Sequence, residues 1–264
     1  MAQQGTIEHT DVTSHAIGIR KIGVNDLWQA LKEGFDDYYA KPTHFAFLFL
    51  IYPLFAVLLT LFLVGQNMLH LAFPIVAGLT LLGPVVSVAL MEMSRRREQG
   101  LEVSWRSAFE FVHTGSFAGI LALSIAMALL YVAWLYMAQF IYLGLFGAVP
   151  LESVGDFVNQ LFTTKRGGAL IVYGTALGAI FAIVAMAISV VAFPLLLDGQ
   201  VSGIRAIQTS IKAVTSNALM MAIWGLVVVA LLAAGAVIFL VGLVVVLPVL
   251  GHATWHLYRK LVET

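Results

Sequence analysis

The last third of the chain contains a long uncharged run, residues 213–258, in which no Asp, Glu, Lys or Arg occurs. Most of the run is Leu, Val, Ile, Ala and Gly. At about 1.5 Å of rise per residue, one helix of this length would be more than twice as long as the hydrocarbon core of a bilayer, which is about 30 Å thick. Two short membrane helices fit, with a turn at the small residues around Gly235; the alternative is a single long tilted span. We therefore expect an integral membrane protein.

The composition of the whole chain also favours lipid as the solvent. Of the 264 residues, 61% are hydrophobic and 11% are charged, whereas soluble domains carry about 25% charged residues. The formal net charge is zero, which argues against nucleic acid as a partner, because a protein that binds the phosphate backbone needs a surplus of Lys and Arg. No cysteine is present, which excludes disulfides, thiolate metal sites and cysteine nucleophiles. Residues 1–41 contain no apolar run, so we expect no signal peptide.

Hydrophobic runs separated by polar loops predict an all-α polytopic membrane helix bundle with six transmembrane helices and short amphipathic interfacial helices. Four spans are expected at 44–64, 69–93, 116–143 and 169–197, and the uncharged run supplies two more from Asn217 onwards. We divide the chain into a polar N-terminal tail (1–24), an amphipathic interfacial helix (25–42), a six-span membrane domain (43–258) and a cytoplasmic tail (259–264). The spans contain prolines that we expect to kink them: Pro53, Pro84, Pro194 and Pro248.

The segment before the first span is amphipathic. Its apolar residues recur at spacings of three and four: Val24, Leu27, Trp28, Leu31, Phe35 and Tyr38. Asn25 is a plausible N-cap and Pro42 ends the segment. Because the segment is too polar to span, we place it in the plane of the membrane interface. Shorter amphipathic patterns begin near Leu101, Leu151 and Ile204.

A coarse threefold repeat is one hypothesis for this order of segments, since a short amphipathic helix precedes each pair of spans. Residues 86–88 (Val-Ser-Val) resemble 188–190 (Ile-Ser-Val), and 190–194 resemble 244–248, which also end in proline. The alternative is that any hydrophobic chain produces such similarities by chance.

The distribution of positive charge predicts that both termini are cytoplasmic. Only Lys165 and Arg166 of the 14 Lys and Arg residues fall in an outer loop of the six-span topology. The densest cluster on the cytoplasmic side is Arg95, Arg96 and Arg97, and the last pair there is Arg259 and Lys260. A five-span topology would move that last pair across the membrane and weaken the bias.

His252 and His256 lie four residues apart at the end of the last predicted span, so they share one helical face. One interpretation is an interfacial belt formed with Trp255 and Tyr258. A second is a metal or haem site, in which His44 on the same side of the membrane would join them. Other hydrogen-bonding roles are the third.

Charged residues near the spans have local explanations. Glu92 precedes Arg95 and Arg96 by three and four residues, which predicts an ion pair on one helix. Asp198 is expected to cap a turn. No acid or base remains within the spans, which disfavours ion-coupled carriers and proton pumps.

Two glycines on the fourth span, Gly174 and Gly178, form a GxxxG spacing that lets another helix approach closely, within the chain or in a dimer.

The closing segment, residues 247–259 (LPVLGHATWHLYR), resembles the C-terminal signature of a family of predicted bacterial integral membrane proteins known only as a domain of unknown function. The segment 28–42 is similar as well, and the resemblance covers about 24–262. Some members carry the label of a putative cytochrome c oxidase subunit I, a protein similar to a twelve-span bundle with six ligating histidines. The resemblance implies the bacterial inner membrane and no established activity.

From these observations we expect a protein that is not an enzyme and has no cofactor. The preferred hypothesis is an accessory or assembly component of the inner membrane that acts through helix packing. Its partners would be the lipid bilayer and another membrane protein or a second copy of the chain. The alternatives are a carrier or lipid-handling protein for neutral or amphipathic cargo, and a haem- or metal-binding redox subunit.

Overall fold

The computed structural model describes residues 17–40, 57–58, 61, 69–104, 106–148, 153–199, 201–237 and 242–263. All regular structure in these ranges is helical, apart from one isolated antiparallel bridge between Ile19 and Val262. The predicted all-α class is therefore confirmed. Four described helical runs are long and apolar enough to cross a membrane: Ala72–Glu98, Phe117–Phe146, Lys165–Asp198 and Ala218–Val237.

The other two spans of the predicted six-span topology are not among these runs. The first predicted span, 44–64, lies largely outside the described residues. The last one forms a helix, Leu243–Leu261, but only its first half is apolar. Its second half is buried in protein. Because this half carries two histidines, Arg259 and Lys260, the mean hydropathy of the whole helix is low.

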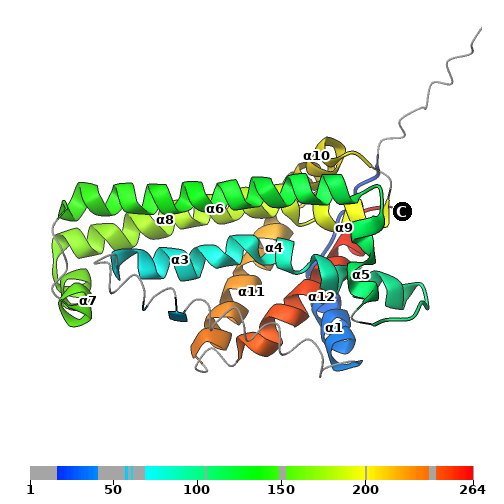
Figure 1. Ribbon diagram of the computed structural model, residues 1–264, viewed down its shortest axis with the longest axis horizontal. Helices are drawn as coiled ribbons and strands as arrows, with labels where there is room; N and C mark the ends of the chain where they lie inside the picture. Colours follow the sequence, from blue (N-terminus) through cyan, green and yellow to red (C-terminus); the bar gives the residue numbers. More distant parts are fainter. Residues whose placement is uncertain are drawn as a thin grey trace, which may run out of the picture.

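The helices of the N-terminal half are α1 (Val24–Ala40), η1 (Leu69–Leu71), α3 (Ala72–Gly78), η2 (Leu79–Leu82), α4 (Gly83–Val86), α5 (Val88–Glu98), η3 (Ser107–His113) and α6 (Phe117–Phe146). Those of the C-terminal half are α7 (Val154–Thr163), α8 (Lys165–Ser189), α9 (Ala192–Asp198), α10 (Gly203–Ser216), α11 (Ala218–Val237) and α12 (Leu243–Leu261). In Figure 1, α6 and α8 run side by side along the long axis, while α11 and α12 lie at a steep angle to them. The helix α1 packs against α12 near the end where α5 and α9 also lie.

Two of the predicted kinks coincide with breaks between helices. Pro84 lies in the first turn of α4, directly after the 3-10 helix η2, and Pro194 lies in the first turn of α9. Proline is tolerated there because the first turn of a helix leaves backbone N–H groups without intrahelical partners. At the second break, the N–H of Val191 donates to Ser210 Oγ of α10 at 3.2 Å. The freed backbone group is thus satisfied by a neighbouring helix.

Helix α11 extends past the position at which the sequence placed the turn of the C-terminal hairpin. Helix α11 continues through Gly235 to Val237, and α12 begins at Leu243. The two arms approach closely at a pair of glycines, because a Cβ added to Gly242 would lie 2.7 Å from Gly235 Cα. The predicted pair of helices in this run is thus present, but residues 238–241 between them lie outside the described ranges, and the small residues around Gly235 lie inside α11. Those residues fit α11 because alanine and the apolar residues around it are good helix formers.

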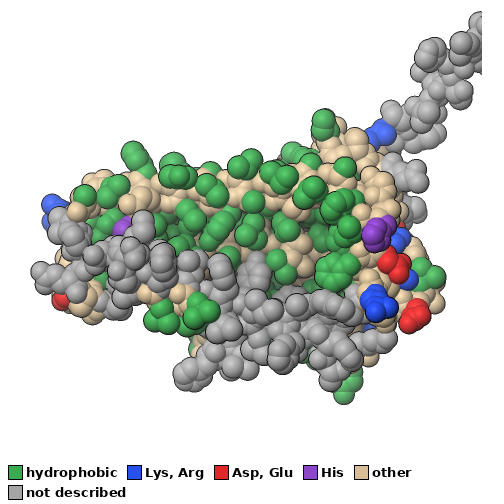
Figure 2. Space-filling model, viewed as in Figure 1, with side chains coloured by type: hydrophobic (Ala, Val, Ile, Leu, Met, Phe, Trp, Pro, Cys, Tyr) green, Lys and Arg blue, Asp and Glu red, His purple; other side chains and the backbone are tan. Residues whose placement is uncertain are grey.

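The hydrophobic core is concentrated where α1, α5, α9, α10 and α12 meet. Its largest fully buried side chains include Trp255, Tyr258 and Phe193. In contrast, α6, α8 and α11 expose many large hydrophobic side chains. Figure 2 shows these side chains over the middle of the long axis and charged side chains at its ends, as expected for a protein that crosses a bilayer.

The short helices pack in a cyclic order that agrees with the threefold repeat hypothesis. The first unit would then be residues 24–98, the second 107–198 and the third 203–261. Helix α1 of the first unit packs against α12 of the third, η3 of the second against α5 of the first, and α10 of the third against α9 of the second. The helices α5, α9 and α12 also contact one another. Each short helix carries a fully buried alanine: Ala30, Ala108 and Ala206. Each unit thus begins with a short helix that docks on the unit before it in the cycle.

Candidate functional site

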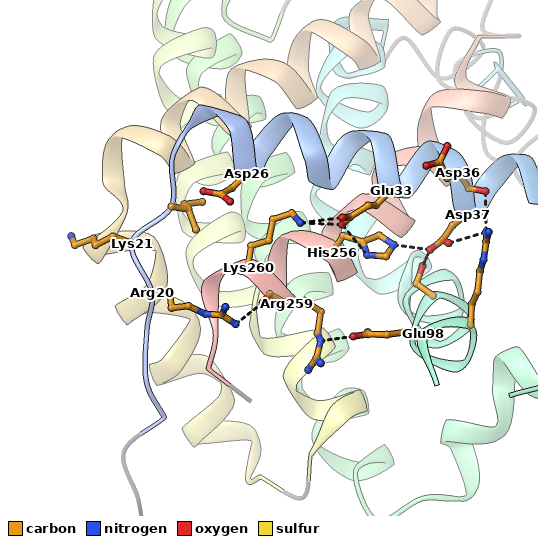
Figure 3. Close-up of a pocket in the computed structure, with 13 residues that line it drawn as sticks. Arg20, Lys21, Asp26, Glu33, Asp36, Asp37, Glu98, His256, Arg259 and Lys260 are labelled. Atoms are coloured by element: carbon orange, nitrogen blue, oxygen red, sulfur yellow. Dashed lines mark hydrogen bonds and ion pairs between the residues drawn. The ribbon is translucent and has the colours of Figure 1, made fainter. Parts of the chain in front are cut away.

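An open, charged cleft of about 660 Å³ lies between the N-terminal segment, α1, α5 and α12 (Figure 3). It is lined by Arg20, Lys21, Ile22, Asp26, Glu33, Asp36, Asp37, Ser94, Arg97, Glu98, His256, Arg259 and Lys260. We call this cavity the charged cleft. Most of its side chains are ionisable, and both signs of charge are present.

Asp37 of α1 is the centre of the polar contacts in the charged cleft. Its carboxylate accepts hydrogen bonds from Ser94 Oγ at 2.6 Å and from His256 Nε2 at 2.8 Å, and it pairs with Arg97 at 3.0 Å. Burial alone would raise the pKa of Asp37, but the hydrogen bonds from His256 and Ser94 and the nearby positive charge outweigh it, so this pKa lies below its usual 3.8. One carboxylate therefore holds α1 against both α5 and α12.

His256 lies between two carboxylates of α1. Its Nε2 faces Asp37 Oδ2 at 2.8 Å, and its Nδ1 faces Glu33 Oε2 at 3.3 Å. Lys260, one turn further along α12, pairs with the same oxygen of Glu33 at 3.1 Å. Both ring nitrogens of His256 therefore face carboxylate oxygens of α1.

His252 is buried, with 4% of its surface exposed, and its Nδ1 lies 2.8 Å from Ser94 Oγ. The same Nδ1 is 4.0 Å from Asp37 Oδ2, so both histidines face one carboxylate and share a helical face as predicted. A second cavity, of about 260 Å³, is lined in part by His252, Ser94 and Asp37. Within the described ranges, no group of three or more His, Asp or Glu side chains is arranged to hold a metal ion, and His44 lies outside them.

A second polar cluster joins α5, α9 and α12. Glu98 accepts from Trp255 Nε1 at 2.9 Å and from Arg259 Nε at 3.0 Å. Asp198 accepts from the hydroxyl of Tyr258 at 2.8 Å and from Arg259 at 3.3 Å. Arg259 thus bridges the ends of two helices that are distant in the sequence.

The prediction that Trp255, Tyr258 and the two histidines form an interfacial belt is therefore wrong. Trp255 is 1% exposed and Tyr258 is 0% exposed, and both pack inside the protein. Aromatic rings at the end of an apolar segment are typical of a membrane interface, but here their polar atoms bind carboxylates. Arg259 and Lys260, predicted to lie in a cytoplasmic tail, belong to the same helix.

The roles of Glu98 and Asp198 were missed for a related reason. Asp198 binds a tyrosine and an arginine of α12, whereas the sequence suggested a local turn cap. Tyr258 and Arg259 follow Trp255 by three and four residues, so the three side chains lie on one side of a helix. That spacing is the signal that could have suggested a shared acidic partner.

The positive cluster after the second predicted span divides its contacts among three helices. Arg95 binds Glu92 on its own helix, at 2.7 and 2.9 Å, so the predicted local ion pair is confirmed. Arg96 lies 3.9 Å from Glu92 and pairs with Glu110 of η3 at 2.6 Å. Arg97 reaches Asp37 of α1. These arginines, predicted to set topology, also hold neighbouring elements together.

The two glycines of the GxxxG pair differ in surroundings. A Cβ added to Gly178 would lie 3.3 Å from the ring of Trp134 in α6, whereas one added to Gly174 would have no such neighbour within 4 Å. Gly178 therefore serves the packing of α8 against α6 within the chain.

Comparison with protein families gives one match. The model of a family described as "Predicted integral membrane protein (DUF2189)" matches residues 72–198, a segment that contains three of the four candidate spans. This is narrower than the 24–262 expected from the resemblance, and the closing motif lies outside it. A search of curated proteins and a search of solved structures found no match. Residues 72–198, just under half of the chain, are therefore similar to the DUF2189 family of predicted integral membrane proteins.

Proposed function

We propose that the protein is a non-enzymatic accessory or assembly component of the bacterial inner membrane, which binds a partner through its charged cleft. The observation that carries this proposal is the mutual pairing of the ionisable groups there. Asp37 is held by three side chains from two other helices, and Arg259 by two acids from two other helices. Groups fixed in this way form a stable polar platform, whereas a general acid or base needs to reach a substrate.

The outer part of the charged cleft offers contacts for a partner. Asp36 is exposed next to the paired Asp37, and Lys21 is exposed at the other end of the cleft. Exposed charges of both signs around a fixed centre suit a polar segment of another protein, because complementary charges fix orientation and exclude wrong partners.

Native mass spectrometry of the full chain in mild detergent tests this proposal, together with cross-linking from a single cysteine. The chain has no cysteine of its own, so Asp36→Cys can carry a photoreactive group at the charged cleft. We expect a homo-oligomer or a co-purifying membrane protein, and adducts formed from position 36. The matched control is Asn159→Cys, which is exposed on α7 at the opposite end of the molecule (Figure 1). A monomer without adducts at position 36 would contradict the proposal.

The second candidate is a carrier for neutral or amphipathic cargo, and the cyclic packing of the short helices favours it. Internal repeats are common in carriers, and their helices are often interrupted near the site of transport. Here α4 and α9 each begin after a break, at Pro84 and Pro194. The contacts of Arg259 with Glu98 and Asp198 would then close one end of the cargo path.

Distances between spin labels distinguish this candidate. Labels on Gln99→Cys and Glu263→Cys, near the ends of α5 and α12, should show two distance populations in nanodiscs, because these ends must separate to admit cargo. A single narrow population with and without membrane lipid extract would argue for the accessory role instead.

A further inference from the structure

Helix α1 exposes a row of large apolar side chains, Val24, Trp28, Phe35 and Tyr39, which we call the outward row. Trp28 is 72% exposed and Tyr39 is 73% exposed. The rings of Phe35 and Tyr39 stack with their centroids 6.4 Å apart and form a continuous aromatic surface. At 100° per residue the four side chains fall within an arc of about 60°, so they share one side of the helix.

The rotation of α1 about its axis is fixed by its contact with α12. Leu27, Ala30 and Gly34 are buried, and a Cβ added to Gly34 would lie 2.6 Å from the backbone nitrogen of Ala253. The outward row is adjacent to this buried side, and α12 does not cover it. Its exposure is therefore a fixed property of the docked helix.

The side of α1 that faces away from the outward row borders the charged cleft. Asp26, Glu33 and Asp37 line that cleft, and they lie roughly opposite the outward row at helical spacing. One side of α1 thus faces an open polar cavity, while the other presents aromatic rings. This is the arrangement of a helix that lies between water and lipid.

The depth of α1 follows from its ion pair with a candidate span. Arg97 is the penultimate residue of the run Ala72–Glu98, and its guanidinium pairs with Asp37 of α1 at 3.0 Å. Since that run ends at the membrane surface if it crosses the bilayer, α1 is held at the level of the headgroups. Tyrosine and tryptophan are enriched at that level because their rings are amphipathic.

We propose that the outward row of α1 is a lipid-binding surface, which inserts into the boundary between headgroups and acyl chains beside the end of α5. Lys32, exposed next to the outward row, lies where its ammonium group reaches lipid phosphates. This inference adds a lipid contact that both the accessory and the carrier proposals leave open.

Spin-label accessibility in vesicles tests the proposal. The full chain is reconstituted into phosphatidylethanolamine–phosphatidylglycerol vesicles with one label at Trp28→Cys, Phe35→Cys or Tyr39→Cys. We expect these labels to be accessible to oxygen, which partitions into lipid, and shielded from a water-soluble nickel chelate. Gln29→Cys and Asp36→Cys, on the polar side of the same helix, should show the reverse.

Two results would overturn the proposal. Nickel access at positions 28, 35 and 39 equal to that at 29 and 36 would place the outward row in water. Shielding of positions 28, 35 and 39 from both reagents would show that protein covers it, either a second copy or another part of the chain. Each label replaces an exposed side chain, so it should not disturb the docking of α1. Along a correctly docked α1, the ratio of oxygen to nickel accessibility should vary with the helical period of about 3.6 residues.

Discussion

Asp37 Oδ2 lies 2.8 Å from His256 Nε2, and this contact joins the first described helix to the last across a separation of 219 residues. Ser94 and Arg97 of α5 bind the same carboxylate. Three helices therefore depend on one side chain, which makes Asp37 the position where a small change should have the largest effect.

Replacing Asp37 with asparagine should destabilise the protein strongly. The substitution keeps the size of the side chain but removes the charge that His256 and Arg97 face in a largely buried site. Removing one partner of a buried ion pair costs about 3 kcal/mol in the free energy of unfolding. Thermal unfolding of the full chain in detergent measures the loss.

The matched control for this change is Asp36→Asn. Asp36 is exposed, and its contact with Arg97 is made through its backbone carbonyl, at 2.9 Å. We expect a change within about 0.5 kcal/mol. Equal effects of the two substitutions would mean that the charge of Asp37 has no special role.

The contribution of Asp37 to the free energy of unfolding should decrease as the pH falls. Its pKa is lower in the folded protein than its usual 3.8, so the folded state favours the ionised carboxylate. This contribution is complete at pH values well above 3.8 and is lost as the pH falls through the lowered pKa of the folded state. The difference in unfolding midpoint between the native chain and Asp37→Asn should therefore be constant near neutral pH and shrink in acid. A difference that grows in acid would contradict the assignment.

Gly34→Ala should weaken the docking of α1. The added Cβ would meet the backbone nitrogen of Ala253 at 2.6 Å, and backbone cannot give way like the end of a flexible side chain. Overpacking of this kind costs about 1–3 kcal/mol. Gly174→Ala is the control, since its Cβ meets no neighbour within 4 Å, and it should be neutral or stabilising by up to about 1 kcal/mol. Protease cleavage near α1 and thermal unfolding together report the difference.

Both ends of the chain should lie on the cytoplasmic side. Positive residues flank the uncharged run on both sides, and the N–H of Arg20 donates to the carbonyl of Leu261 at 2.8 Å. A reporter fused after Thr264 and one fused after Lys21 should both read cytoplasmic, whereas one inserted at Gly155 should read external. An external reading at the C-terminus would contradict this topology.

The periodicity of α1 could be predicted from the sequence, but its rotation could not. Spacings of three and four residues placed Leu27, Trp28 and Phe35 on one apolar side. In the structure Leu27 is buried, whereas Trp28 and Phe35 are exposed. Contact with protein and contact with lipid both favour apolar residues. Hydrophobicity alone therefore does not tell which apolar residues of α1 face protein and which are exposed.

The partners of the polar side chains of α12 could not be predicted from any local pattern in the sequence. His252 and His256 were found because two histidines four residues apart share a face. Their partners Ser94 and Asp37 lie 158 and 219 residues away. The ion pair of Glu92 with Arg95, by contrast, follows from local spacing on one helix and was predicted. Proximity along the chain decided which polar contacts could be foreseen.

The pairing of the first and last helices has a consequence for biosynthesis. When the ribosome has made α1, helix α12 has not yet been translated, so His256 and Lys260 are not yet available to pair with Asp37 and Glu33. Helix α1 can therefore dock only after α12 has been translated. A chain that stops before α12 leaves α1 without the helix that holds it, and an undocked terminal segment is open to proteolysis.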